Sequence, residues 1–121
     1  MKKRLSINLN QKMFSQINKI KTGSLIVGIF ESSNINNHIK PIDLATDGVL
    51  RKLKKLGELE GKVSQSSYLP ALSGVKAERV YLVGCGKKGL KLKKEEVKKV
   101  LSKMVDCAIS SGAVEASILI P

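Results

Sequence analysis

The order of hydrophobic and polar residues predicts strands of two kinds. Leu5, Ile7 and Leu9 alternate with polar residues, which is typical of a strand with one buried face. Residues 24–30 (SLIVGIF) form an unbroken apolar run, as expected for a central strand covered on both faces. The runs at residues 79–85 and 116–120 also predict strands inside a sheet.

A shorter strand is predicted at residues 68–72. Pro70 lies inside this segment and has no backbone N–H to donate. A proline is tolerated at the edge of a sheet or in a bulge, so we expect this strand to lie at an edge.

Apolar residues recur at helical spacing in two other segments. From Pro41 to Leu56 the pattern predicts one helix, with Gly57 near its C-terminal end. Gly48 lies inside it and costs roughly 1 kcal/mol of helix propensity, which close approach to the sheet would offset. Residues 93–111 predict a second helix, with lysines opposite an apolar stripe formed by Val97, Val100, Leu101, Met104, Val105, Ala108 and Ile109. Strands that alternate with helices indicate an α/β layered sheet with right-handed crossovers.

The composition fits one compact domain over residues 1–121. The chain is 42% hydrophobic but only 3% aromatic, so Leu, Ile and Val must form the core. Its 22 Lys and Arg against 10 Asp and Glu give a formal charge of +12. Such a charge attracts nucleic acid, anionic membrane or acidic protein, although it also serves solubility alone.

Cysteine use and hydropathy indicate a cytoplasmic protein with no membrane partner. Cys85 and Cys107 are far apart in the sequence, and no export signal precedes them. The longest apolar run is far shorter than a bilayer span. The chain stops directly after a predicted core strand, which favours a domain taken from a longer protein.

One segment matches a phosphate-binding pattern in its letters. Residues 84–89 read GCGKKG, which satisfies G-x-G-x-x-G between a strand and a helix. Gly84, Gly86, Lys87 and Lys88 are therefore a candidate phosphate loop. The third glycine lies ahead of the helix and no acidic residue ends a following strand, so a strand-exit turn with two lysines is the favoured interpretation.

Other candidate residues favour structural roles, and we predict no catalytic or metal-binding residue in this chain. Glu58 and Glu60 could form a carboxylate pair, but flanking glycines favour a structural turn. His38 has no partner at metal-ligand spacing and is predicted to be a surface imidazole. Nearby lysines could lower the pKa of Cys85, but packing as a small hydrophobe is favoured for both cysteines.

Two segments carry a resemblance to a known family. Residues 57–65 read GELEGKVSQ and residues 77–87 read AERVYLVGCGK. Together they resemble the amino-terminal domain of the leucyl (cytosol) aminopeptidases, and the similarity covers most of the chain. Ser64 stands where the family usually has glycine, and Lys93 stands where a Ser, Thr or Asp helix cap is usual.

The resemblance implies a macro-domain-like fold, a three-layer α/β sandwich whose mainly parallel or mixed central sheet has helices on both faces. It also implies a following catalytic domain, absent from this chain, that carries two divalent metals (Mn or Zn), a catalytic lysine and the substrate pocket. The full-length parent would be a homo-hexamer that releases amino-terminal residues from peptides. We therefore expect an accessory domain without a cofactor, inactive alone, that serves hexamer organisation and surface interactions beside its own catalytic domain.

Two alternatives remain open. Some bacterial members of the family bind DNA, and a lysine surface could bind phosphates in a salt-dependent way. The candidate DNA contacts are Lys87, Lys88, Lys91, Lys94 and Lys98. Binding of ADP-ribose, by analogy with macro domains, is less favoured because it rests on fold alone.

Overall fold

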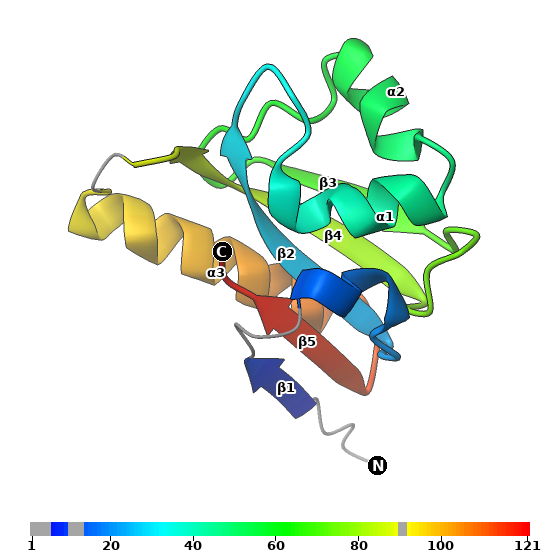
Figure 1. The fold of residues 1–121 in the computed structure, drawn as a ribbon. Coiled ribbons are helices and arrows are strands. Elements are labelled where there is room, and N and C mark those ends of the chain that lie inside the picture. Colours follow the sequence, from blue (N-terminus) through cyan, green and yellow to red (C-terminus); the bar gives the residue numbers. More distant parts are fainter. Residues whose placement is uncertain (1–5, 10–13, 90–91) are drawn as a thin grey trace.

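A five-stranded sheet forms the middle layer of the protein (Figure 1). The computed structural model describes residues 6–9, 14–89 and 92–121. In chain order its elements are β1 (Ser6–Leu9), η1 (Phe14–Lys19), β2 (Ser24–Glu31), η2 (Asn37–Ile39), α1 (Lys40–Ala45), α2 (Val49–Lys55), β3 (Ser66–Pro70), β4 (Arg79–Lys87), α3 (Lys94–Ser110) and β5 (Glu115–Leu119).

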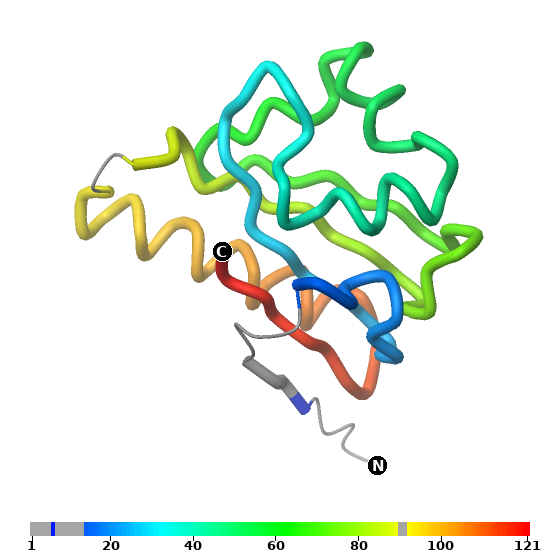
Figure 2. The backbone as a smooth tube through the Cα atoms, viewed as in Figure 1, coloured from blue at the N-terminus to red at the C-terminus, as the bar shows by residue number. Residues whose placement is uncertain are grey.

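The strand order is β1-β5-β2-β4-β3. The first four of these strands run parallel, and β3 pairs antiparallel with β4. Helices cover both faces, with α3 on one side and η1, η2, α1 and α2 on the other (Figures 1 and 2). The predicted α/β fold with a mixed central sheet is therefore confirmed.

Strand β2 is the central strand that its sequence predicted. Residues 24–29 are all buried, and the strand pairs with β4 on one side and with β5 on the other. The predicted strands at 79–85 and 116–120 are also confirmed, within two residues at each end. The first strand is present as β1; Leu5 and the side chains of residues 7–9, on which its predicted half-burial depends, lie outside the described part.

Strand β3 lies at the edge of the sheet, as Pro70 predicted. It begins two residues before the predicted 68–72, where Ser66 pairs with Val83, and it ends two residues early because the chain turns away at Ala71, which has a φ of 49°. Tyr68 is half-exposed on this strand and stacks on Tyr81 of β4, with ring centroids 4.7 Å apart.

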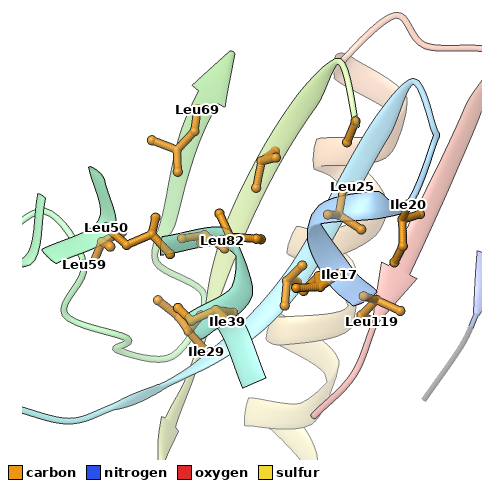
Figure 3. Packing of buried hydrophobic residues seen from close by; sticks show 14 residues of the cluster. Ile17, Ile20, Leu25, Ile29, Ile39, Leu50, Leu59, Leu69, Leu82 and Leu119 are labelled. Atoms are coloured by element: carbon orange, nitrogen blue, oxygen red, sulfur yellow. The ribbon is translucent and has the colours of Figure 1, made fainter. Parts of the chain in front are cut away.

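Two aliphatic clusters hold the layers together, one on each face of the sheet. The larger cluster joins β2, β4 and β5 to η1, η2, α1 and α2 (Figure 3). Ile17 of η1 is fully buried in it, although the polar sequence around that residue predicted no element there. The second cluster packs Val100, Met104, Cys107 and Ala108 of α3 against the opposite face.

The single helix predicted over residues 41–56 is wrong, because the chain breaks into α1 and α2 at Gly48. Gly48 has a φ of 85° and is the N-cap of α2, a backbone conformation that glycine adopts at little steric cost. A Cβ at this position would meet the Arg51 side chain, so the glycine does not serve close approach to the sheet. The helical spacing runs through the break because both helices turn an apolar side toward the same core.

Buried Asp43 ties the two short helices together. One carboxylate oxygen accepts a hydrogen bond from the Arg51 backbone N–H at 3.1 Å, and the other lies 2.7 Å from Arg51 Nε. The backbone N–H of Arg51 is one of the first N–H groups of α2, which have no acceptor within the helix. Asp43 therefore caps α2 from a position five residues before its N-cap.

Helix α3 confirms the prediction for residues 93–111 and uses half of a capping box. Lys93 is the N-cap and makes no side-chain capping bond, but its backbone N–H donates to the Glu96 carboxylate at 3.2 Å.

In the described part of the chain, no helix has the length and apolar character needed to cross a bilayer.

Candidate functional site

The two sequence segments that carry the family resemblance contact each other through their backbones. Gly84 N–H donates to the Gln65 carbonyl at 2.7 Å, and Gly86 N–H donates to the Gly61 carbonyl at 2.9 Å. Ser64 N–H donates back to the Gly84 carbonyl at 3.0 Å. The end of β4 and the turn at residues 61–65 thus form one hydrogen-bonded unit.

Close backbone approach explains the glycine at position 84. A Cβ there would overlap the carbonyl oxygen of Lys62 and lie 2.6 Å from the carbonyl carbon of Gly61. Gly57 and Gly61 have φ values of 78° and 80°, which confirms that this segment is a structural turn. Ser64 also has a left-handed φ, of 61°.

The same hydrogen bonds limit what the candidate phosphate loop can offer. The backbone N–H groups of Gly84 and Gly86 already have protein acceptors, whereas a phosphate-binding loop directs such groups at its ligand. Lys87 and Lys88 follow with exposed side chains. The loop can therefore supply lysine charge, but not the two glycine amides.

The end of β4 and the start of α3 lie at one end of the molecule (Figure 1), and both segments carry exposed lysines. Lys94 and Lys98 are exposed on the first turns of α3, four residues apart and therefore on one side of the helix. Lys91 lies outside the described residues. Four of the five predicted DNA contacts thus lie close in the fold, with Glu95 and Glu96 among them.

A cleft of about 740 Å³ opens beside Lys88, where β2 and β5 end. It is lined by Phe14, Phe30, Glu31, Ser32, Asn34, Ile35, Asn36, Asn37, His38, Lys88, Ile120 and Pro121. Crevices at the carboxyl ends of strands are common ligand sites in α/β sheets. Sequence reasoning missed this cleft because its lining comes from four separate segments.

His38 is partly buried in the wall of that cleft, so the predicted surface imidazole is only partly exposed and also has a structural role. Its Nε2 lies 2.6 Å from the Gly28 carbonyl oxygen and donates to it, and its ring meets Phe14 and Phe30 edge-on. Burial lowers the pKa of His38, the charge of Lys88 lowers that pKa further, and the bond to Gly28 opposes both. Burial therefore favours the neutral form of the imidazole.

A second, wider hollow of about 870 Å³ follows α1 and α2. Basic side chains at its rim include Lys40, Lys52, Lys54 and Lys55, and the buried Asp43 lies among them. The cluster of lysines at residues 52–55 is visible in the sequence. The sequence does not reveal that this lysine cluster lies beside Asp43, because that arrangement depends on the break between α1 and α2 at Gly48.

The thiols pack in the core on the α3 face, as predicted. Cys85 and Cys107 are free and buried, and burial raises the pKa of both groups. Thiols of this kind are poor nucleophiles. Within residues 6–9, 14–89 and 92–121, no group of three or more His, Cys, Asp or Glu side chains could hold a metal ion.

Comparison with known proteins gives a consistent assignment. Residues 26–121 match the model of the cytosol aminopeptidase family, N-terminal domain. A probable cytosol aminopeptidase of Nitrosococcus oceani is 40% identical over 100 residues, and one of Glaesserella parasuis is 37% identical over 100 residues. Each alignment covers 83% of this chain but 20% of the relative, so the chain spans about one fifth of their length.

A solved structure shows the same fold. A lysine-to-glutamate mutant of tomato leucine aminopeptidase superposes with a TM-score of 0.70 at 20% sequence identity, covering 97% of this chain and 23% of that one. The family match covers more than half of the chain and includes both contacting segments described above. The chain therefore belongs to the cytosol aminopeptidase family and corresponds to its amino-terminal domain.

Proposed function

We propose that this chain is the non-catalytic amino-terminal domain of a cytoplasmic, metal-dependent aminopeptidase that releases amino-terminal residues from peptides. The observation that carries the proposal is the family match over residues 26–121, combined with relatives about five times longer than the chain. Two divalent metals (Mn or Zn) and the substrate pocket would lie in the catalytic domain that follows. In that site the metals would activate water and polarise the peptide carbonyl.

The structure of the domain supports an accessory role. His38 donates its Nε2 proton to a backbone carbonyl, and both thiols are buried with a raised pKa. None of these three groups is prepared to act as a nucleophile or general base. What the domain presents outward is lysine-rich surface, consistent with contacts in the proposed homo-hexamer and with surface interactions.

Hydrolysis of leucine p-nitroanilide tests this proposal. The 121-residue chain and its full reading frame are compared at equal molar concentration with Mn²⁺ or Zn²⁺, and again after chelation. We expect the longer protein to be active only with metal and the 121-residue chain to be inactive. Turnover by the 121-residue chain, or a full reading frame without a metal-dependent peptidase half, would overturn it. Light scattering on the longer protein tests the hexamer.

DNA binding is a second candidate function, favoured by the exposed Lys87, Lys88, Lys94 and Lys98 at one end of the molecule. Lysines provide charge without the paired geometry that reads bases, so binding would be independent of sequence. Each phosphate contact contributes a slope of about −0.9 to log K against log salt. Four contacts predict a slope near −3.6 by the same rule. Affinity that does not change with salt would exclude this function.

Binding of phosphate or ADP-ribose has less support. The cleft beside Lys88 is large enough for a small ligand, but the Gly84 and Gly86 amides are already bonded. Calorimetry with ADP-ribose tests it directly, and the absence of binding heat would exclude it.

A further inference from the structure

Helix α3 carries a row of apolar side chains that the sheet does not cover. Val97, Leu101, Val105 and Ile109 are 40%, 44%, 39% and 63% exposed. We call these four residues the α3 row. They repeat every fourth position, so they form one ridge that spans about 18 Å at 1.5 Å per residue.

The α3 row is distinct from the side of the helix that packs on the sheet. The core contacts come from Val100, Met104, Cys107 and Ala108, which form a neighbouring line on the helix. The helical periodicity of the sequence predicted a single apolar stripe that contains both the α3 row and most of these core residues. A continuous apolar ridge, unlike scattered exposed residues, marks a contact surface.

We propose that the segment following residue 121 in the full-length protein packs on the α3 row. This inference rests on the proposed function, under which the chain continues into a catalytic domain. The matched relatives extend for about four fifths of their length beyond the region shared with this chain. An occupant of sufficient length is therefore expected within the same polypeptide.

Pro121, from which such a segment would continue, lies near the buried side of α3. Pro121 Cδ lies 2.7 Å from the point that a Cβ on Gly28 would occupy, and Met104 Cε lies 3.2 Å from the same point. Ile120 packs against the α3-side cluster. Met104 belongs to the core side of α3, and Ile120 and Pro121 also line the cleft beside Phe14 and His38. A segment that continues from Pro121 therefore starts at the end of the sheet, from which it can reach α3.

The small area of the row favours a tethered segment over a second copy of the chain. A stable complex of separate proteins buries about 800 Å² on each partner, and four partly exposed aliphatic side chains fall well short of that. A segment linked to residue 121 binds intramolecularly, at an effective concentration in the millimolar range for a short linker. A surface as small as the α3 row is then sufficient to hold the linked segment in place.

Hydroxyl-radical footprinting with mass spectrometry tests the proposal on the full-length protein and on the 121-residue chain. We expect modification of Leu101 and Ile109 to fall about fivefold or more in the full-length protein, as for a side chain that becomes fully buried. Leu56 is 74% exposed in the other helical layer and serves as the internal control. Equal modification of the α3 row in both proteins would overturn the proposal. Protection in the 121-residue chain that increases with concentration would also overturn it, because a second copy would then be the occupant.

A pair of matched variants separates docking from folding. Leu101→Lys and Leu56→Lys both alter exposed residues, so neither should shift the urea midpoint of the 121-residue chain measurably. In the full-length protein, only Leu101→Lys should restore modification of Val105. Equal effects of the two variants would contradict the proposal. Leucine anilide turnover, measured in parallel, tests the proposed function separately: an active enzyme with an unprotected row refutes only this inference.

Discussion

Replacing Asp43 with alanine is expected to destabilise the helical layer formed by α1 and α2. The Asp43 side chain is 7% exposed and receives both the backbone N–H and the Nε–H of Arg51. In Asp43→Ala the backbone N–H of Arg51 loses its acceptor at the start of α2. The hydrophobic contacts of Ile42 and Leu50, which anchor the two helices in the core, depend on this connection.

The expected loss of unfolding free energy follows from the two contacts between Asp43 and Arg51. Removing a helix-capping acceptor costs about 1 kcal/mol, and the buried, charged character of this one raises the total to about 2–3 kcal/mol. The ion pair itself adds little, because the Arg51 side chain is 63% exposed and solvent screens it. Asp43→Asn keeps an acceptor oxygen and should lose only about 1 kcal/mol, the charged share of the bond.

Urea unfolding of the 121-residue chain, followed by circular dichroism at pH 7, measures these differences. Asp106→Ala is the matched control, because Asp106 is an exposed acid on α3 and its replacement should change stability by no more than about 0.5 kcal/mol. The capping argument is refuted if Asp43→Ala unfolds at the same midpoint as Asp106→Ala. It is also refuted if Asp43→Asn is as unstable as Asp43→Ala, because charge alone would then explain the loss.

Three further predictions concern single positions. Ser64→Gly should raise the unfolding free energy by about 0.5 kcal/mol, since relief of a left-handed φ outweighs the greater freedom of the unfolded chain; a lower urea midpoint would contradict this. Gly84→Ala should destabilise by about 1–3 kcal/mol through overlap with the Lys62 carbonyl, and amide exchange of Gly86 should speed up; unchanged exchange would show that the turn adapts freely. Burial lowers the pKa of His38, so its neutral form contributes stability above pH 6.5 that is lost as the pH falls through the folded-state pKa. Unfolding free energies measured from pH 7.5 to 5 should therefore fall more steeply for the wild type than for His38→Gln, and parallel curves would show that His38 does not control this dependence.

The strands were predictable because their signals are local. The unbroken run at residues 24–30 predicted burial on both faces, and β2 has neighbours on both sides and helices above and below. Pro70 predicted an edge because a missing N–H has the same consequence in any fold. The pattern of residues 93–111 located α3 for the same reason.

The features that sequence reasoning missed depend on partners that are distant in the chain or that interrupt a regular pattern. Helical periodicity cannot reveal the break at Gly48, because α1 and α2 pack on one core and keep the pattern in phase. The backbone N–H groups of Gly84 and Gly86 bond to Gln65 and Gly61, which lie 19 and 25 positions earlier in the chain. His38 looked like a surface residue because its acceptor, Gly28, lies on a different element.

The sheet order also has a consequence for how the protein is made. Of the five described strands, β5 is synthesised last, yet it lies between β1 and β2 and pairs with both. While the ribosome is still translating residues before 115, β1 has no neighbour and only β2, β3 and β4 can associate. A nascent chain therefore leaves β1 without its sheet partner until residues 115–119 have emerged, and an unpaired strand of this kind is open to misassembly during synthesis.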